Sequence, residues 1–224
     1  MKNTKYDDDF QSYLVEGATF SGACGIPNLL DLNNASVPKR LVPFDKCRLD
    51  KAKEGYVHFY IHDNRYGAIL VATKRMIPLL QQFDGVISPD PSILINQSRC
   101  LQQANVYLNR AVGYYLQIKG IPVIPNVRWG DESTYDFCFL GIPRGSLISV
   151  GTHGCMKNSV LKRAFAKGLP VMLEALNPRK IIVYGTMPDE IFSPYKNYFE
   201  FVRFPSEIEI IHKAEGGKQY GDGR

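Results

Sequence analysis

The feature that most constrains the fold of this chain is the alternation of short apolar runs with amphipathic helical patterns. The apolar runs are rich in β-branched and aromatic residues, which predicts strands. The six runs are Tyr56–His62, Gly85–Ser88, Ile121–Val127, Leu147–Val150, Lys180–Tyr184 and Phe199–Phe204. The helical patterns are Thr73–Phe83, Gln102–Lys119 and Lys157–Leu176. Runs this short and this apolar are typical of strands buried on both faces, so the sequence predicts an α/β protein.

Alternating strands and helices predict a mostly parallel sheet connected by right-handed crossovers. We expect a small or incomplete TIM-like barrel, and an open three-layer α/β sheet is the alternative. Pro170 has no N–H donor and crowds the preceding turn, so it should kink or split the helix that contains it.

Breaker residues divide the chain into three predicted parts. Residues 1–50 have weak periodicity and many glycines and prolines, which indicates an irregular N-terminal wrap with one short strand near Arg40–Phe44. Residues 51–213 form a single α/β domain. Residues 214–224 are polar and glycine-rich, which predicts a disordered tail.

Composition excludes several classes of protein. The chain has 224 residues, of which 45% are hydrophobic and 22% charged, so it is neither disordered nor fibrous. It has no apolar stretch of the roughly 20 residues that a membrane helix needs, and its first residues lack the pattern of a secretory signal. We therefore expect a cytoplasmic protein with no membrane partner and with five reduced cysteines. The net charge of +5 permits an anionic partner such as a nucleotide or nucleic acid.

Polar residues follow the predicted strands at the points where they end. The strand-end segments are His62–Asp63, Ser88–Ser92, Arg128–Glu132, Gly151–Gly154 and Tyr184–Gly185. Because the carboxyl ends of parallel strands open on the same face, we expect these side chains to converge on one cleft. The alternative is that they only terminate strands and begin loops.

Three carboxylates, Asp63, Asp90 and Asp131, would then face one pocket, with Glu132 as the alternative to Asp131. Such a set can perform general acid–base catalysis, or it can hold a divalent cation through oxygen ligands. The sequence assigns no definite metal ligands. Around Asp90, the Pro-Asp-Pro-Ser sequence is equally good turn and helix-cap chemistry.

The segment Gly151–Thr152–His153–Gly154 lies between a predicted strand and a predicted helix, and Lys157 follows it. Glycines and a free helix N-terminus can hold a phosphate, and His153 can carry a proton near neutral pH. The alternative is a tight turn next to a solvated basic face. Trp129, the only tryptophan, either stacks on a base or sugar ring or fills the core.

The chain also resembles DUF4417, a family of domains of unknown function found in bacteriophages, conjugative elements and bacteria. The matching segments are Phe59–Asp63, Gly85–Ser92, Asn109–Arg110, Gly120–Asp131, Phe137–Pro143, Gly151–Gly154 and Pro178–Gly185. The family usually has an aromatic residue after the aspartate at position 90, where this chain has Pro91. Ser92, Arg110 and Tyr184 lie in or beside these segments and complete the predicted ligand-binding set. The resemblance implies a mobile-element context and no defined activity.

Three functions fit these features. The first is an enzyme, a hydrolase or a transferase, that acts on a nucleotide or nucleic acid by cleavage or transfer at a phosphoester or glycosidic bond, with Asp90, Asp131, Asp63 and His153 as catalytic residues. The second is a non-catalytic module that binds nucleic acid or a protein. The third is a structural protein whose polar strand ends only build loops.

Overall fold

The structure is a computed structural model that describes residues 11–32 and 36–216. The rest of the predicted N-terminal wrap and residues 217–224 of the predicted tail lie outside this range. The strands are β1 (Phe20–Ser21), β2 (Ile26–Pro27), β3 (Leu41–Pro43), β4 (Tyr56–His58), β5 (Gly85–Ile87), β6 (Val123–Ile124), β7 (Leu147–Gly151), β8 (Lys180–Tyr184) and β9 (Phe201–Phe204). The α-helices are α2 (Gly67–Val71), α3 (Thr73–Leu80), α4 (Arg99–Ile118), α5 (Tyr135–Cys138), α6 (Ser159–Leu176), α7 (Asp189–Phe192) and α8 (Glu207–Gly216). Short 3₁₀ turns are η1 (Ser12–Val15), η2 (Phe44–Lys46), η3 (Asp63–Arg65), η4 (Glu132–Thr134) and η5 (Ser193–Tyr195).

The strands form two parallel sheets whose order follows the sequence. One sheet has the order β3-β4-β5-β6, and the other has the order β7-β8-β9. A single parallel bridge between Asn126 and Ser149 links the two sheets. The predicted α/β fold with parallel strands is therefore confirmed. The strands β1 and β2 form a separate antiparallel hairpin against α4.

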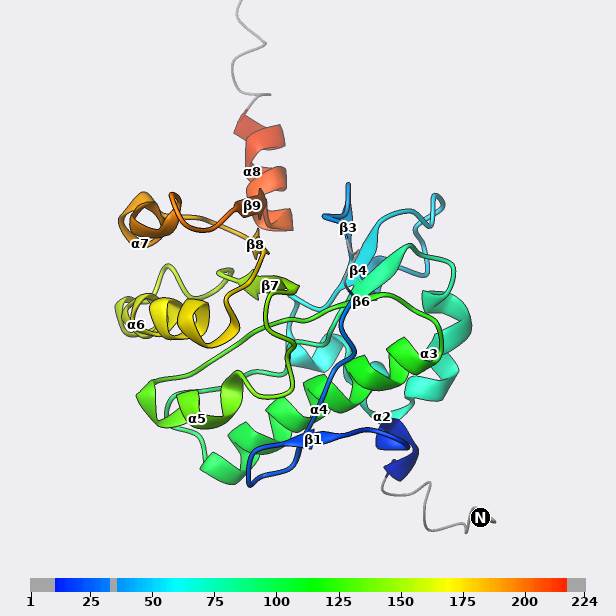
Figure 1. Cartoon of the computed structure of the whole chain (residues 1–224). Helices are drawn as coiled ribbons and strands as arrows, with labels where there is room; N and C mark the ends of the chain where they lie inside the picture. Colours follow the sequence, from blue (N-terminus) through cyan, green and yellow to red (C-terminus); the bar gives the residue numbers. More distant parts are fainter. Residues whose placement is uncertain (1–10, 33–35, 217–224) are drawn as a thin grey trace, which may run out of the picture.

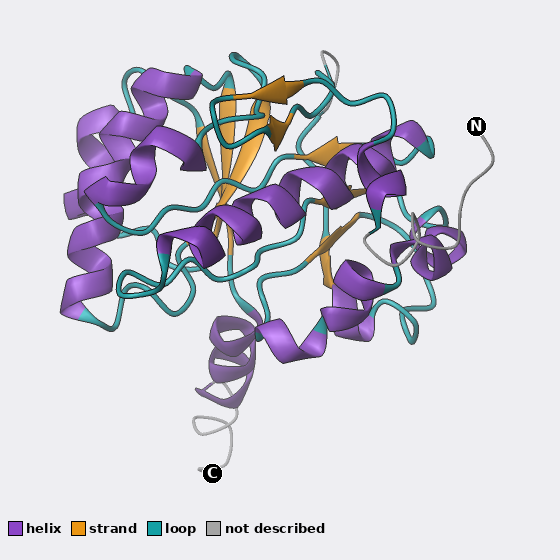
Figure 2. Ribbon diagram, turned by 90° about the horizontal axis from the view of Figure 1, so that it is seen from below, coloured by secondary structure: helices purple, strands orange, loops and turns teal. Residues whose placement is uncertain are grey.

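The two linked sheets, β3 to β6 and β7 to β9, are called the strand wall below. The strand order places all the crossover helices on one face of this wall. Right-handed crossovers that always step to the next strand put every helix on the same side. Figures 1 and 2 show the helices around the outside of the strands. The opposite face must then be buried by the strands themselves, so the wall has to curve.

The buried side chains confirm this curvature. Alternate residues point outward, into clusters shared with the helices, or inward. The inward cluster is Tyr56, Tyr60, Ile87, Ile124, Leu147, Ile182 and Tyr184, and its members come only from the strands and their ends. The rings of Tyr60 and Tyr184 stack with centroids 4.9 Å apart, which brings the end of β4 against β8. Among the described residues no pairing joins β9 to β3, so the strands form no closed barrel.

Several element predictions change in detail. The helix α6 continues from Ser159 through Pro170 to Leu176, so the prediction that Pro170 splits it is wrong. Buried Leu169, Met172 and Leu173 hold both sides of the proline against the core. The helix begins two residues later than predicted because the side chain of Asn158 caps it.

Two observations bear on the predicted boundaries between the three parts of the chain. The strand β3 pairs with β4, so part of the predicted wrap belongs to the wall. The helix α8 extends to Gly216 and overlaps the start of the predicted tail. It begins with a local capping motif, in which Ser206 Oγ donates to Glu209 Oε2 at 2.9 Å and the Ser206 N–H donates to the same oxygen. The division into three parts stays a prediction. No helix within the described residues is both long enough and apolar enough to cross a membrane.

Candidate functional site

A cleft with a volume of about 540 Å³ opens at the carboxyl ends of the strands. Its lining comes from the segments after β4, β5 and β6, from the ends of β7 and β8, and from the start of α8. The lining residues are Tyr60, Ile61, His62, Asp63, Asn64, Arg65, Asp90, Ser92, Arg128, Gly151, His153, Gly154, Tyr184, Glu207 and Ile208. The predicted convergence is therefore observed for Asp63, Asp90 and His153, whose chemical roles stay predictions.

Asp63 lies in η3 and is exposed to the cleft. Its Oδ1 accepts a hydrogen bond from Ser92 Oγ at 3.0 Å, and its Oδ2 accepts one from the Ser92 N–H at 3.2 Å. The Tyr66 hydroxyl lies 3.0 Å from Asp63 Oδ1 and 2.7 Å from the carbonyl oxygen of Asp90. Ser92, a predicted ligand-binding residue, thus fixes the orientation of a carboxylate that faces the solvent.

Asp90 differs from Asp63 because both of its oxygens are occupied and its side chain is buried. Oδ1 accepts a hydrogen bond from Asn126 Nδ2 at 2.7 Å, and Oδ2 accepts one from Arg128 Nη1 at 2.6 Å. Burial raises the pKa of Asp90 above its ordinary value, and the neighbouring Arg128 and Asn126 oppose this rise. Asp90 therefore holds its neighbours in place more than it faces a ligand.

A buried polar network lies beneath Asp90. The Tyr60 hydroxyl is 3.0 Å from Asn126 Oδ1 and 2.7 Å from Ser149 Oγ. The Asn126 N–H donates to Ser88 Oγ at 2.8 Å, and that hydroxyl donates to Asn109 Oδ1 at 2.9 Å. These bonds connect β7 and α4 with the segments that follow β4, β5 and β6. Buried polar groups bonded in this way hold a site rigidly.

Sequence reasoning assigned no individual role to Tyr60, Asn126, Ser149 or Arg128. Tyr60 looked like one more aromatic residue in a strand, and Arg128 appeared only as part of a strand end. The available signal was Asn126, an amide within the apolar run Ile121–Val127, because a buried strand accepts a polar side chain only with bonded partners.

His153, Gly154 and Tyr184 also line the cleft. His153 is exposed there. The Tyr184 hydroxyl accepts a hydrogen bond from the Glu207 N–H at 3.3 Å, and burial raises the pKa of Tyr184 to about 12. Gly151 leaves space for the ring of Tyr60, because a Cβ at this position would lie 2.8 Å from that ring. The buried Thr152 hydroxyl donates to the Thr186 carbonyl at 2.6 Å and so braces the backbone.

The start of α6, where the sequence predicts a phosphate site, is capped by the chain itself. The segment after Gly154 makes a further turn before α6 begins at Ser159. Asn158 Oδ1 already accepts hydrogen bonds from the N–H groups of Val160 and Leu161. Lys157 is exposed and is not part of the cleft lining. The local chain caps the helix itself and leaves these donors unavailable to an anion.

Asp131 and Glu132 lie in a different hollow of about 390 Å³, between η4 and α6, so the prediction that Asp131 shares the cleft is wrong. Asp131 Oδ1 accepts hydrogen bonds from Ser133 Oγ at 2.6 Å and from the Ser133 N–H at 3.1 Å, which caps η4. Glu132 pairs with Lys167 at 2.9 Å on the surface. Buried Trp129 anchors the chain in the core between Arg128 and these residues and directs them away from the cleft.

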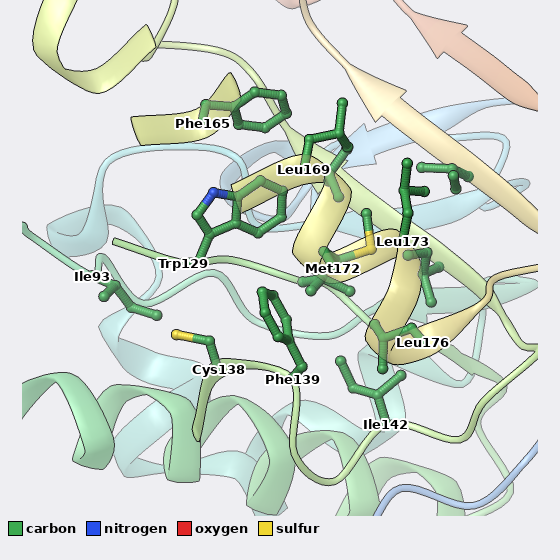
Figure 3. Close-up of a cluster of buried hydrophobic side chains, with 14 of the residues drawn as sticks. Ile93, Trp129, Cys138, Phe139, Ile142, Phe165, Leu169, Met172, Leu173 and Leu176 are labelled. Atoms are coloured by element: carbon green, nitrogen blue, oxygen red, sulfur yellow. The ribbon is translucent and has the colours of Figure 1, made fainter. Parts of the chain in front are cut away.

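Trp129 fills the core rather than the cleft (Figure 3). Its ring stacks on Phe165 with centroids 4.9 Å apart, and its Nε1 donates to the Ala164 carbonyl at 3.3 Å. Gly168 makes the space, because a Cβ there would lie 2.2 Å from Trp129 Nε1. The alternative interpretation of Trp129 as a core residue is therefore confirmed.

Arg110 also lies outside the cleft and is only 1% exposed. Its guanidinium donates to the carbonyl oxygens of Cys138 at 2.9 Å, Leu140 at 3.0 Å and Asn126 at 3.1 Å. Burial lowers the pKa of Arg110 to about 10. Its contacts join α4 to the chain around α5, which is a structural role.

The described residues bring together no group of three or more His, Cys, Asp or Glu side chains able to hold a metal ion. The five cysteines, all within the described ranges, are free thiols. The expected divalent metal therefore gains no assigned ligands, and it stays a prediction.

Comparisons with known proteins place the chain among phage proteins. Two curated relatives are the "Gene 1 protein" of Mycobacterium phage D29 and the "Gene 1 protein" of Mycobacterium phage L5, each 32% identical over 133 residues. The matched segment is 59% of this chain, 49% of the D29 protein and 58% of the L5 protein. The chain thus spans about half the length of these relatives. No solved structure matches it.

The model of the family described as "Domain of unknown function (DUF4417)" matches residues 18–205, a range that includes every strand of the wall and all the cleft residues before α8. The chain belongs to the DUF4417 family.

Proposed function

We propose that the protein is a hydrolase that cleaves a nucleotide or the end of a nucleic-acid strand, at a phosphoester or glycosidic bond, in the cleft at the carboxyl ends of the strands. The observation that carries this proposal is the difference between two carboxylates in one cleft. Asp63 is exposed and oriented by Ser92, whereas Asp90 is buried and bonded to Arg128 and Asn126. The contrast assigns proton transfer to Asp63, whose carboxylate is exposed, and assigns to Asp90 the holding of Arg128.

The cleft has the size and the polar groups that such a ligand requires. A volume of about 540 Å³ lies within the range of small-molecule sites, roughly 300–1,000 Å³. Two arginines, Arg65 and Arg128, and two histidines, His62 and His153, line it. The phage relatives favour a partner among nucleotides and nucleic acids, and such a partner together with reduced cysteines favours the cytoplasm.

In the proposed reaction Asp63 acts as the general base. It takes a proton from a water molecule, whose oxygen forms the new bond to phosphorus or to the sugar C1′. The bond to the leaving oxygen or base nitrogen breaks with its electron pair on the leaving atom. His153, which lines the same cleft, donates the proton that the leaving atom needs.

The test is a turnover assay on nucleotides and short DNA and RNA strands, with chromatographic separation of released base, nucleoside and phosphate. We expect Asp63→Asn to lower kcat by about 10²–10⁴-fold, which is the usual contribution of general acid–base catalysis. Released base would identify a glycosidic bond, and released phosphate or shortened strands would identify a phosphoester bond.

Two further variants make this assay decisive. Asp189→Asn changes an exposed carboxylate paired with Lys196, and it should leave turnover at the wild-type level. Loss of activity with Asp131→Asn but not with Asp63→Asn would move the chemistry to the second hollow and contradict the proposal. Binding of a substrate without any turnover would favour the non-catalytic binding module.

A further inference from the structure

Two arginines that line the cleft are each paired with a carboxylate that is largely buried. Arg128 Nη1 donates to Asp90 Oδ2 at 2.6 Å, and Arg65 Nη2 forms an ion pair with Asp45 Oδ2. The side chains of Asp90 and Asp45 are only 9% and 12% exposed, whereas those of Arg128 and Arg65 are 30% and 50% exposed. Each of these arginines therefore lines the cleft with a guanidinium that is paired with a less exposed carboxylate.

Within the described part of the chain, each of these guanidinium groups has N–H donors without a hydrogen-bond partner in the protein. A guanidinium has five N–H donors in one plane. Among the described residues, Nη1 is the only nitrogen of Arg128 with a hydrogen-bond partner in the protein. The ion pair of Arg65 with Asp45 involves Nη2. The remaining donors are available to an acceptor that enters the cleft.

Asp90 is itself held so that it can orient Arg128. Its second oxygen accepts a hydrogen bond from Asn126, and the Tyr60 hydroxyl lies 3.0 Å from the amide oxygen of Asn126. A carboxylate with both oxygens occupied is poorly placed to exchange protons with a substrate. The same carboxylate is well placed to keep a planar guanidinium at one angle.

The other carboxylates of the cleft leave room for an anion. Glu207 is paired with Lys46 at 2.7 Å, which offsets its charge. Asp63 accepts hydrogen bonds from Ser92, so its charge is partly compensated. The net effect is a cleft with two anchored cations next to one reactive carboxylate.

We infer that Arg65 and Arg128 form a binding site for a phosphate group, with Asp45 and Asp90 as positioning residues. Guanidinium matches phosphate oxygens with two parallel hydrogen bonds, which an ammonium cannot reproduce. The identity of the ligand, a terminal phosphate of a nucleotide or of a nucleic-acid strand, rests on the proposed function. The anion site itself does not depend on hydrolysis.

The test is calorimetric titration of the full chain with inorganic phosphate, a nucleoside 5′-monophosphate and the matching nucleoside. Short DNA strands with and without a 5′-phosphate distinguish a nucleic-acid end from a free nucleotide. We expect the wild type to bind every phosphorylated probe and to bind the nucleoside and the unphosphorylated strand at least tenfold more weakly. Binding of phosphate should weaken as salt concentration rises.

Arginine-to-lysine variants isolate the guanidinium from its charge. Arg128→Lys and Arg65→Lys keep a cation beside each buried carboxylate, so the fold should survive, as circular dichroism can verify. Each should weaken phosphate binding about tenfold, or about 1.4 kcal/mol. Arg163→Lys changes an exposed arginine in the second hollow and should leave binding unchanged. Equal affinities for the wild type and both cleft variants, or no saturable binding of any phosphorylated probe, would overturn the inference.

The positioning role of Asp90 has its own readout. Asp90→Asn should weaken phosphate binding while Asp90→Glu restores part of it, because only the carboxylate can hold Arg128. Phosphate binding without turnover would leave the anion site standing and remove the hydrolase. Turnover that depends on Asp63, with an unchanged KM for a phosphorylated substrate in Arg128→Lys, would leave the hydrolase standing and remove the anion site.

Discussion

At the scale of single residues, the polar side chains in and around the cleft differ in how many of their hydrogen-bonding atoms already have a partner. Asp90 in the cleft has both oxygens occupied, and Arg110 outside it donates to the backbone carbonyls of Leu140 and Cys138. Asp63 and His153 face the solvent of the cleft. Reactivity is therefore expected of the second pair and rigidity of the first.

His58 carries the clearest pH prediction. It lies 1% exposed in β4 beside Tyr184, and burial followed by the nearby His153 lowers the pKa of His58 to about 3. An unfolded histidine has a pKa of about 6.5, so the unfolded chain takes up a proton that the folded protein refuses. This contribution to stability is present above pH 6.5 and is lost as the pH falls toward 3, by at most about 1.4 kcal/mol per pH unit.

Chemical unfolding of the wild type and His58→Phe between pH 7 and pH 4 checks this prediction. The variant should lose less stability than the wild type over that interval. Val57→Ala, a buried neighbour without a titratable group, should be less stable at every pH and retain the wild-type pH dependence. Asp90 acts in the opposite direction, because its raised pKa favours the folded state at low pH, but it is common to all three proteins. Equal pH slopes in the wild type and His58→Phe would refute the role of His58.

At the scale of elements, local signals and tertiary packing compete. Asn158 caps the start of α6, and Ser206 caps the start of α8. Both are local signals, because each cap bonds to a residue two or three positions later. Pro170 opposes the helix in which it lies, and the helix continues because buried Leu169, Met172 and Leu173 hold it against the core. Packing therefore decides the outcome at Pro170, at a cost in helix stability.

Replacing Pro170 by alanine should raise the free energy of unfolding by about 1–3 kcal/mol. Alanine restores the N–H donor and removes the ring clash, worth about 3 kcal/mol, and loses roughly 0.4–1 kcal/mol because the unfolded chain becomes more flexible. Pro188→Ala is the control, because Pro188 precedes α7 as its N-cap residue and interrupts no helix. Denaturant titration measures both. A Pro170→Ala protein no more stable than the wild type would show that the ring itself packs favourably.

At the scale of the whole molecule, the strand wall and α8 form separable layers. The family model ends at residue 205, before α8 begins. Three isoleucines of α8, Ile208, Ile210 and Ile211, are about half exposed, so the helix buries little apolar surface. Its contacts with the wall include the Lys46–Glu207 ion pair and the Tyr184 hydroxyl, at the side where β9 and β3 do not pair (Figure 1).

A chain that ends at Ser206 should therefore still fold. Removing α8 breaks the partly exposed ion pairs Lys46–Glu207 and Arg203–Glu209 and the hydrogen bond from the Glu207 N–H to Tyr184. Contacts of these kinds together stabilise the fold by about 2 kcal/mol or less. For a chain of this size such a change lowers Tm by about 4–8 °C at most. Thermal unfolding followed by circular dichroism measures the change, and the single substitution Glu207→Gln is the milder control. A truncated chain that does not fold would show that α8 belongs to the core.

The sequence by itself determined the elements and their class. The apolar runs around β4, β5, β7 and β8 predict strands because burial of a strand is written in consecutive residues. Alternation with helices predicts parallel pairing, and parallel strands place their polar ends together. That argument brought Asp63, Asp90 and His153 to one cleft from positions far apart in the chain.

Only the tertiary structure decided which strand-end residues face the cleft and how open the wall is. Arg128 lines the cleft and Asp131 does not, although three positions separate them, because Trp129 is buried between them. The network beneath Asp90 joins Tyr60 to Asn126, 66 positions later, and no local pattern encodes that contact. A polar residue near a strand end can lie in a cleft, a cap or the core. What distinguishes these fates is the packing of residues distant in sequence.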